Sequence, residues 1–469
     1  MQALAPDLNY DNSLREADKA HHLHPYHVFD DHRVNGALHI ASGTGAWIED
    51  TQGNRYLDAV GGMWCTNIGL GRKEMADAIA EQVLQLGYSN PFADMANPRA
   101  IELCRKLAEL APGDLNHVFL TTGGSTAVDS AIRLVHYYNN CRGKPEKKHI
   151  LTRFSAYHGS TYLTMSLGGK TADRPPEFDF LQEGIHHLSA PYSYRAPEGM
   201  DEAAFLSFLL EEMESRILAI GPDKVAAFIA EPVFGSGGVM VPPKGYHRGM
   251  WEICQRHDVL YISDEVVTGF GRLGHMFASK TVFDVQPDII TSAKGLTSGY
   301  LPLGACIFSD RIWEVIAEPG SGRCFAHGFT YSGHPVACAA ALKNIEIIER
   351  EQLCQRADEV GRYFEERLAT LAGLPLVGDV RGMRLMACVE FVADKRTKEL
   401  FPEALNIGEW VHVRAQRRGL LVRPILHLNV MSPPLVLTHE EADFIVEVLR
   451  ESILETAADL QAAGHWSPG

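Results

Sequence analysis

The stretch HVFLTTGGSTAVDSAIRLVHYYNN, from His117 to Asn140, decides the fold class. It begins with a short apolar run of the kind that becomes a buried strand, and two glycines follow soon after. In the remainder, Ala127, Ala131 and Leu134 recur at the spacing of one helix face. The stretch therefore predicts a strand that leads directly into a helix, which is the unit from which parallel sheets are built.

The same alternation continues along the middle of the chain. Further apolar runs occur in HILTRF, KVAAFIAEPV, VLYISDEVV, PDIITSAK and GACIFS, with helix-like stretches such as GYHRGMWEICQRHD between them. This rhythm predicts an α/β fold with a mostly parallel central sheet and helices on both of its faces. In such sheets, ligands bind beyond the carboxyl ends of the strands.

The two ends of the chain have a different character. GAWIEDTQGNRYLDAV is typical of a strand, a turn and a strand, and LPLVGDVRGMRLMACVEFV indicates a second small strand set late in the chain. We expect a smaller α+β domain built from both termini. The expected division is an N-terminal segment at 1–35, the first part of the small domain with a connecting segment at 36–112, the large domain at 113–342, and the second part of the small domain at 343–469.

Composition narrows the function classes. The 469 residues are 46% hydrophobic and 22% charged, as in ordinary globular enzymes. The formal charge of −16 argues against a basic face for nucleic acid. No apolar run approaches the ~20 residues of a membrane helix, and the polar N-terminus does not resemble a signal peptide. Nine cysteines without a Cys-x-x-Cys pair favour reduced thiols, so we expect a cytoplasmic protein with no nucleic-acid or membrane partner.

A possible anion site follows the first strand of the middle region. Gly123, Gly124, Ser125 and Thr126 come directly after the strand and open the helix. Glycines allow a close backbone approach, and the first helical N–H groups favour an anion such as a phosphate. The alternative is that Ser125 or Thr126 merely caps the helix.

Three other strand ends carry side chains that can bind a ligand or take part in a reaction. Tyr157 can form the wall of a flat-ring site, Asp264 closes an apolar strand, Val266 follows on the same side as Asp264, and Lys294 ends another apolar run. Each alone has an ordinary structural explanation. Together with a phosphate cradle they match pyridoxal phosphate: the lysine bonds to the aldehyde, and the aspartate keeps the pyridine nitrogen protonated.

With these residues the sequence resembles a known family, the class III aminotransferases, which are fold type I pyridoxal-phosphate-dependent transferases. It is most similar to their bacterial ω-transaminase branch, which uses pyruvate and amines. The resemblance runs from about Trp47 to about Leu449. It is carried by GGMWCTNIGLGR, TTGGSTAVDSAIRL, AYHGST, AEPVFGSGGV, ISDEVVTGFGRLG, TSAKGLTSGYLPLGA and GFTYSGHPVACAAAL.

The resemblance implies a role for each matching residue. Lys294 matches the Schiff-base lysine and Asp264 the partner of the pyridine nitrogen. The other implied cofactor contacts are Tyr157 and Val266 on the two ring faces, Gly124 and Ser125 at the phosphate, Glu231 near the cofactor, and Thr330 at the phosphate of the neighbouring subunit's cofactor. The family is at least dimeric, so we expect a homodimer, or a tetramer, with active sites at the interface.

The substrate side is less well defined. Arg423 is most simply a surface or structural residue, but the resemblance implies a movable arginine that binds the oxo-acid carboxylate. The resemblance implies Trp64, Phe92 and Tyr157 as pocket walls, with Phe92 contributed by the partner subunit, and Phe234 as a weaker candidate. Plain core packing is the alternative for Trp64, Phe92 and Phe234. The expected donors are diamines or polyamines, ω-amino acids, or arylalkylamines, with pyruvate as the expected acceptor.

Two positions depart from the pattern of most relatives. Thr126 stands where a glutamate is usual, which changes a charge at the helix start. Val267 stands where ornithine- and γ-aminobutyrate-type relatives often have glutamine, which weakens an ornithine assignment.

Other functions remain open from the sequence. A metal hydrolase is the rival from another class, because five histidines gather near the N-terminus, at His21, His22, His24, His27 and His32. No acid or cysteine with ligand spacing accompanies them, so we expect surface histidines and no metal. A non-catalytic binding module would leave the strand-end groups without a purpose. A 2-oxoglutarate-using aminotransferase, or an aminomutase or decarboxylase of the same fold, remains an alternative.

Overall fold

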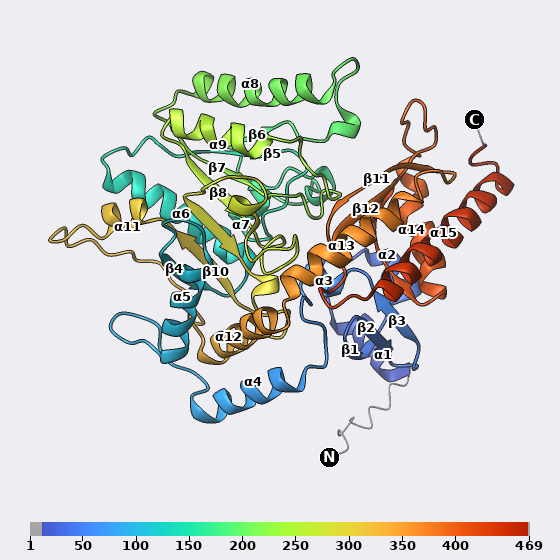
Figure 1. Ribbon diagram of the computed structural model, residues 1–469, viewed down its shortest axis with the longest axis horizontal. Helices are drawn as coiled ribbons and strands as arrows, with labels where there is room; N and C mark the ends of the chain where they lie inside the picture. The colour runs from blue at the N-terminus through green and yellow to red at the C-terminus, as the bar shows by residue number, and fades with distance from the viewer. Residues whose placement is uncertain (1–11, 468–469) are drawn as a thin grey trace.

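The structure of the protein is a computed structural model, in which residues 12–467 are described. Its central feature is a seven-stranded sheet (Figure 1). In spatial order the strands are β4 (His117–Thr121), β10 (Gly304–Phe308), β9 (Ile289–Ser292), β8 (Leu260–Asp264), β7 (Val225–Ala230), β5 (His149–Arg153) and β6 (Ile185–Leu188). Only β10 runs antiparallel to its neighbours, so the predicted mostly parallel sheet is confirmed.

Helices cover both faces of this sheet, as predicted. The helices of this part of the chain are α4 (Lys73–Gln85), α5 (Pro98–Leu110), α6 (Gly124–Cys141), α7 (Tyr162–Leu167), α8 (Glu202–Ile220), α9 (Tyr246–Arg256), α10 (Ala278–Thr281), α11 (Asp310–Ile316) and α12 (Pro335–Arg350). Three short 3-10 helices accompany them: η1 (Thr171–Asp173), η2 (Ser193–Arg195) and η3 (Lys294–Leu296).

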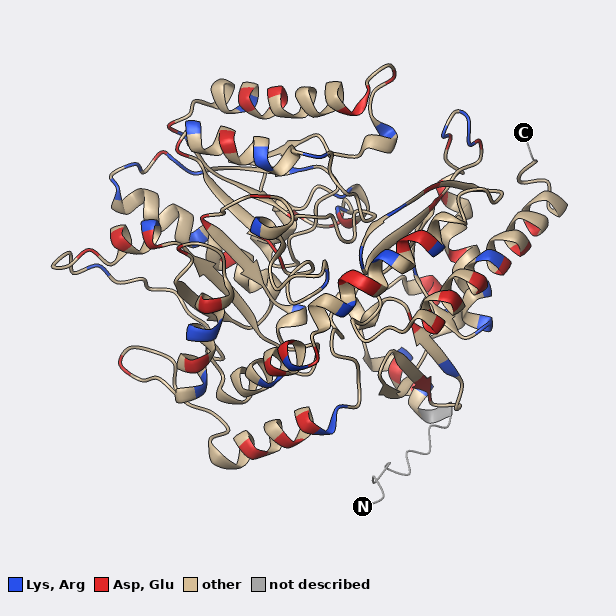
Figure 2. Ribbon diagram, viewed as in Figure 1, with Lys and Arg blue, Asp and Glu red and all other residues tan. Residues whose placement is uncertain are grey.

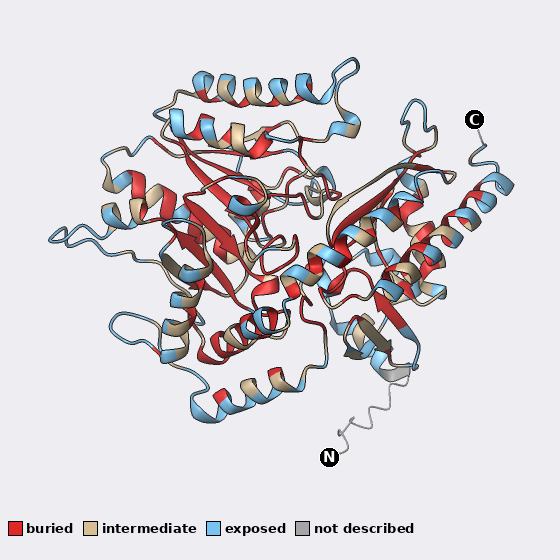
Figure 3. Cartoon of the chain, in the orientation of Figure 1, coloured by how far each residue is buried: buried red, intermediate tan, exposed pale blue. Residues whose placement is uncertain are grey.

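Strand β7 shows why the sheet is sandwiched between helices. Its six residues, VAAFIA, are all buried. Because side chains alternate along a strand, Ala227 and Ile229 pack toward α6, whereas Phe228 and Ala230 pack toward α8 and α9. A strand that is apolar on both faces can be stable only between two layers, and Figure 3 shows the central strands buried throughout.

Two smaller sheets lie to one side of the large one (Figure 1). The first contains β1 (Ile40–Thr44), β2 (Trp47–Asp50), β3 (Arg55–Asp58) and β13 (Leu420–Leu421). The second contains β11 (Val377–Met383), β12 (Met386–Phe391), β15 (Leu428–Met431) and β14 (Arg423–Ile425). The accompanying helices are α1 (Asn12–His21), α2 (Phe29–Asn35), α3 (Gly61–Trp64), α13 (Leu353–Ala369), η4 (Glu403–Leu405), α14 (Ile407–Arg417) and α15 (His439–Ala462).

Both ends of the chain contribute to the first small sheet. Strand β13 pairs in parallel with β3, with Leu420 opposite Leu57. The expected α+β part from both termini is therefore present, whereas the domain boundaries at 35, 112 and 342 remain predictions. Residues 1–11 of the expected N-terminal segment lie outside the described residues.

Charge is spread widely over the molecule. Figure 2 shows acidic and basic residues interspersed on the outer helices. In the part of the chain that the structure describes, no helix combines the length and the apolar composition that crossing a bilayer requires.

Candidate active site

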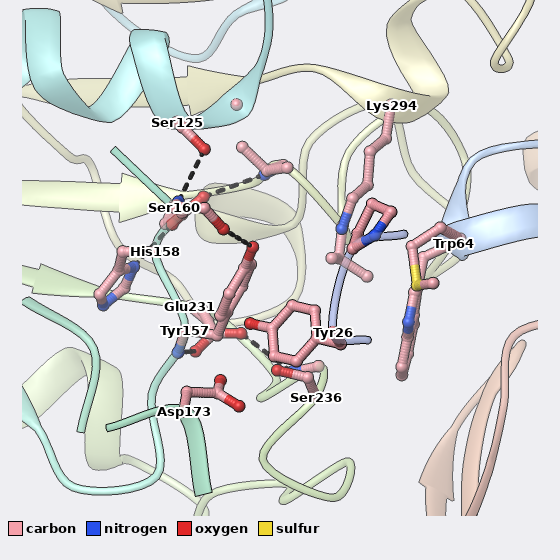
Figure 4. Close-up of a pocket in the computed structure, with 18 of the residues that line it drawn as sticks. Tyr26, Trp64, Ser125, Tyr157, His158, Ser160, Asp173, Glu231, Ser236 and Lys294 are labelled. Atoms are coloured by element: carbon pink, nitrogen blue, oxygen red, sulfur yellow. Dashed lines mark hydrogen bonds and ion pairs between the residues drawn. The ribbon is translucent and has the colours of Figure 1, made fainter. Parts of the chain in front are cut away.

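A cavity of about 450 Å³ lies at the carboxyl ends of the central strands. Its lining is mostly apolar and brings together residues from distant parts of the sequence. Of the residues implied by the resemblance, it contains Trp64, Gly124, Ser125, Tyr157, Glu231, Asp264, Val266, Lys294 and Arg423. Figure 4 shows several of them with their side chains turned toward one another.

Lys294 follows β9 and begins η3. Its backbone has a φ of 45°, in the left-handed region that lysine rarely adopts, and such conformations gather at functional sites. The side chain faces the cavity, and burial lowers the pKa of its amine, although the Asp264 carboxylate opposes this shift. A lysine of lowered pKa supplies more of the neutral, nucleophilic amine.

Asp264 ends β8 and is held by three hydrogen bonds. The His158 ring donates from Nδ1 to Oδ2 at 2.6 Å, the Thr291 hydroxyl donates to Oδ1 at 3.1 Å, and the Val266 backbone N–H donates to Oδ1 at 3.2 Å. The carboxylate is almost fully buried, so these donors replace the water that it loses. Its orientation is therefore fixed before any ligand arrives.

The start of α6 has the features of an anion cradle. Its N-cap is Gly123, and no side chain caps the helix. Ser125 does not cap it either: its hydroxyl accepts a hydrogen bond from the Ser160 backbone N–H at 3.0 Å. A side chain at Gly124 would place its Cβ 2.9 Å from Val266 Cγ1, so only glycine allows this approach. Among residues 12–467 no side chain caps the first N–H groups of the helix, and Gly124, Ser125 and Ser160 line the cavity beside them.

Glu231 holds the segment that carries Tyr157. Its carboxylate accepts hydrogen bonds from the Tyr157 N–H at 3.1 Å and the Gly235 N–H at 2.9 Å. Burial raises the pKa of the Glu231 carboxyl, and the nearby His158 opposes this effect. The ring of Tyr157 lines the cavity, and its hydroxyl is 2.9 Å from the Ser160 hydroxyl.

Arg423 brings a cation to the apolar side of the cavity. Its guanidinium Nη1 lies 2.8 Å from the Met63 sulfur, and within residues 12–467 no carboxylate forms an ion pair with it. Burial lowers the pKa of Arg423, whereas charge interactions with Tyr26 and Asp173 raise it. Trp64 is almost completely buried; it lines the cavity and also packs in the core. The pocket-wall and core-packing interpretations of this residue are therefore compatible.

Three sequence-predicted residues are not part of this cavity. Phe234 was expected beside the pocket walls, but it is fully buried in the core, with the Arg153 guanidinium 4.0 Å from its ring centroid. Phe92 and Thr330 are exposed and lie on one shared surface. A Cβ at Gly328 would lie 3.2 Å from the Phe92 ring, and the Tyr88 hydroxyl donates a hydrogen bond to the Thr330 carbonyl. Their expected role is at the partner subunit's cavity, and it remains a prediction.

The cavity also contains residues to which sequence reasoning gave no role. They are Pro25, Tyr26, Met63, His158, Gly159, Ser160, Asp173, Gly235, Ser236 and Val267. His158 stands next to Tyr157 in the sequence, and its position as a polar residue after a strand could have marked it as a site residue. Tyr26 and Asp173 come from segments with no pattern that points to a site.

The N-terminal histidines form a cluster around one acid. His22 and His24 lie 3.1 and 2.9 Å from Asp18 Oδ1, and His32 and His39 lie 3.4 and 3.3 Å from Asp18 Oδ2. The expectation that no acid has ligand spacing here was therefore wrong, because α1 brings Asp18 to the centre. The contacts give the histidines a structural partner, and the absence of a metal remains a prediction.

Comparisons with known proteins agree with this geometry. Residues 29–453 match the family described as "Aminotransferase class-III". The chain belongs to the class III aminotransferases.

Individual relatives of this aminotransferase are similar over nearly the whole chain. It is 40% identical over 443 residues to the putrescine–pyruvate aminotransferase of Pseudomonas aeruginosa, which covers 94% of this chain and 96% of that protein. It is 42% identical over 415 residues to the diaminobutyrate–2-oxoglutarate transaminase of Halomonas elongata, with 87% and 88% covered. The crystal structure of the ω-transaminase from Pseudomonas jessenii in complex with PMP superposes with a TM-score of 0.93 and 38% identity, covering 97% and 100%.

The cofactor of this aminotransferase is pyridoxal 5′-phosphate, and the cavity fits it. The uncapped start of α6 matches the phosphate, and the Lys294 amine can take the aldehyde. Within the described residues, the buried Ser236 hydroxyl has no hydrogen-bond partner, so the cavity retains polar capacity for a ligand. Membership of the family rests on the match over residues 29–453, whereas the roles of the individual site residues are proposals.

Proposed function

We propose that this aminotransferase moves an amino group from an amine without an α-carboxylate to pyruvate, in two half-reactions that share one cavity. The observation that supports this most directly is that Lys294, Asp264 and Arg423 all face that cavity. An amine donor and an oxo acid must both fit there. The donor is a diamine or polyamine, an ω-amino acid or an arylalkylamine.

Each side chain has a distinct part in this proposal. When bound, the cofactor supplies an aldehyde for the amino group and a ring that withdraws electrons from the neighbouring carbon. Lys294 holds the cofactor at rest and, once released, accepts and returns a proton at Nζ. Asp264, fixed by His158, holds the proton on the ring nitrogen. Gly124 and Ser125 bind the phosphate, while Tyr157 and Val266 enclose the ring.

Arg423 is proposed to bind the carboxylate of the oxo acid. It is the cation at the apolar side of the cavity, and a guanidinium can donate two parallel hydrogen bonds to a carboxylate. Since no ion pair among the described residues holds the guanidinium, it can turn away when an uncharged donor enters. Trp64 forms an apolar wall beside it.

Pyruvate is favoured as acceptor by the Pseudomonas aeruginosa relative, which is named for putrescine and pyruvate. Val267 in place of a frequent glutamine also favours this branch. The second candidate is an enzyme that uses 2-oxoglutarate, as the name of the Halomonas elongata relative states for that protein.

We also propose a homodimer, or a tetramer, whose active sites lie at the subunit interface. The exposed surface that carries Phe92 and Thr330 also contains the exposed rings of Tyr88 and Tyr331, whose centroids are 6.3 Å apart. Leu84 at the end of α4 is 89% exposed. Contiguous exposed apolar side chains of this kind mark interaction surfaces, which supports Phe92 and Thr330 as contributors to the partner's site.

A cytoplasmic location is proposed as well. All nine cysteines are free thiols in the structure, and four of them are buried. Reduced cysteines are the rule in the cytosol.

The test is a panel of amines against oxo acids with the holoenzyme. Alanine is measured as the product from pyruvate, and glutamate as the product from 2-oxoglutarate. Alanine formation in proportion to the carbonyl product is expected. If no amine yields alanine but glutamate appears, the 2-oxoglutarate candidate replaces the proposal. If the amine changes without either product, an aminomutase or decarboxylase is the better assignment.

A further inference from the structure

Asp173 is an acid in a cavity whose proposed chemistry gives it no task. It ends η1 in the segment after α7, lines the cavity, and has a side chain only 13% exposed. Figure 4 shows its carboxylate at one end of the drawn group of residues and Lys294 at the other, with Tyr157 and Tyr26 between them in this view. The lining of the cavity thus contains both a reactive amine and an acid.

The carboxylate of Asp173 is oriented but not saturated. Lys170 donates a hydrogen bond to Oδ1 at 2.9 Å. In the part of the chain that the structure describes, Oδ2 accepts no hydrogen bond. Because a carboxylate has room for about four donors, one bond from Lys170 fixes its direction and leaves capacity for another cation.

Neighbouring groups show that the charge of Asp173 acts inside the cavity. Burial and, next to it, the Asp173 carboxylate raise the pKa of the Tyr26 hydroxyl. Asp173 also favours the charged form of Arg423. Tyr26 and Arg423 both line the cavity, so the negative charge is directed toward the space that a substrate occupies.

We propose that Asp173 is a specificity-determining residue that binds the distal ammonium of an α,ω-diamine while the proximal amino group reacts near Lys294. The inference rests on the proposed transaminase function and selects one of its three donor classes. An ω-amino acid would instead place its carboxylate at Arg423, and an arylalkylamine would place an apolar group beside an acid. Of the three donor classes, only the diamines and polyamines carry a second ammonium that can pair with Asp173 while the first amino group reacts near Lys294.

Arg423 makes the requirement for Asp173 stricter. Its cation faces the same space and repels a second ammonium. Asp173 offsets that repulsion, so its removal should affect a diamine far more than a monoamine of equal length. A hydrogen bond between charged groups corresponds to roughly a tenfold to hundredfold effect on binding.

The experiment compares 1,4-diaminobutane with butylamine, and 1,5-diaminopentane with pentylamine, in the holoenzyme and two variants. Asp173→Asn removes the charge and keeps the shape. Asp179→Asn is the matched control, because Asp179 is an exposed acid six residues away on the same segment and outside the cavity. The reaction is followed without an oxo acid, from the change in the visible absorbance of the bound cofactor as each amine reacts.

The expected result is that Asp173→Asn lowers the apparent second-order rate constant of the half-reaction with each diamine about tenfold or more, mainly through a higher apparent Kd, and changes the paired monoamine less than threefold. Asp179→Asn should leave both unchanged, and Asp173→Glu should recover part of the diamine preference. Equal losses for diamine and monoamine, or no loss at all, would overturn the role of Asp173. Because this half-reaction needs no acceptor, a failure to use pyruvate would refute only the proposed function.

Discussion

Lys294 combines an unusual backbone with an unusual environment. A left-handed φ at a lysine costs on the order of 1 kcal/mol or more, so the surrounding structure must impose it. Ala293 and Leu296 beside it are buried, and burial lowers the pKa of the Lys294 amine, which favours its neutral form. Position 294 is thus built to present an amine to the cavity.

Substitution of this lysine tests the covalent role. Lys294→Ala should lower turnover more than about 100-fold, because both the cofactor attachment and the proton carrier are lost. The visible absorbance of the bound cofactor should change as well. After borohydride reduction, mass spectrometry of the wild type should find the cofactor on the peptide that contains residue 294.

Lys280→Ala is a suitable control for that experiment, because Lys280 is exposed and, among the described residues, forms an ion pair only with Asp284, at 2.8 Å. It should keep full activity and the cofactor label. A label on a different lysine in the wild type, or full activity in Lys294→Ala, would refute the assignment.

The two half-reactions should respond differently to loss of Arg423. Arg423→Ala should weaken the half-reaction with pyruvate about tenfold or more, mainly through a higher apparent Kd, since the carboxylate loses its cation. The half-reaction with an uncharged donor such as a benzylic amine should change little. The measurement is stopped-flow absorbance of each half-reaction, and equal losses in both would argue against a carboxylate-binding role.

Nine of the nineteen residues that line the cavity could be predicted, in part because strand ends concentrate ligand-binding groups. Asp264 and Lys294 follow apolar runs directly, and a charged residue there needs a reason. Tyr26 and Asp173 could not be found in this way. They lie in irregular segments, and only tertiary packing brings these segments to the carboxyl edge of the sheet.

At the scale of elements, the turn after β5 and the start of α6 depend on each other. Gly159 has a φ of 133°, and a Cβ there would lie 2.5 Å from Ser125 Oγ and 2.8 Å from Ser125 Cα. The next residue, Ser160, donates its N–H to the Ser125 hydroxyl. The close approach of turn and helix therefore sets the shape of the anion cradle.

Gly159→Ala should weaken cofactor binding about tenfold, because the turn must move away from the helix start. Gly143→Ala is the matched control: Gly143 also has a positive φ, 72°, but a Cβ there would meet nothing within 4 Å. Equilibrium dialysis of the cofactor measures the difference. Both variants should lose some thermal stability from backbone strain, and equal cofactor affinities in the two would contradict the argument.

The central elements were predictable because β4, β5, β7, β8, β9 and β10 are short apolar runs, and all of these strands except the partly buried β4 are buried over most of their length. The histidine-rich segment was not predictable in its detail. Its histidines surround Asp18 only because α1, the following turn and α2 fold back on one another, and no local pattern announces that contact.

At the scale of the whole molecule, the exposed surface around Phe92 and Thr330 predicts that each active site contains residues from two subunits. If Thr330 serves the partner's cofactor, a site needs Lys294 from one chain and Thr330 from the other. A dimer that combines one Lys294→Ala subunit with one Thr330→Ala subunit would then contain one site with both native residues.

Mixing the two variants after mild dissociation should therefore restore activity to about half of the wild-type value per mixed dimer, with native cofactor affinity in that site. The mixed species can be isolated with two different affinity tags. If Thr330 acts within its own subunit, the mixed dimer would never exceed the Thr330→Ala level. Each unmixed variant, treated in the same way, is the control.

The parallel pairing of Leu57 with Leu420 has a consequence for biosynthesis. The ribosome exposes the early strand long before its neighbour is translated. At roughly 5–20 residues per second the wait is on the order of 20–70 seconds. During that interval the early edge needs another cover, such as a chaperone, and a nascent chain arrested before the final strands would display it to other polypeptides.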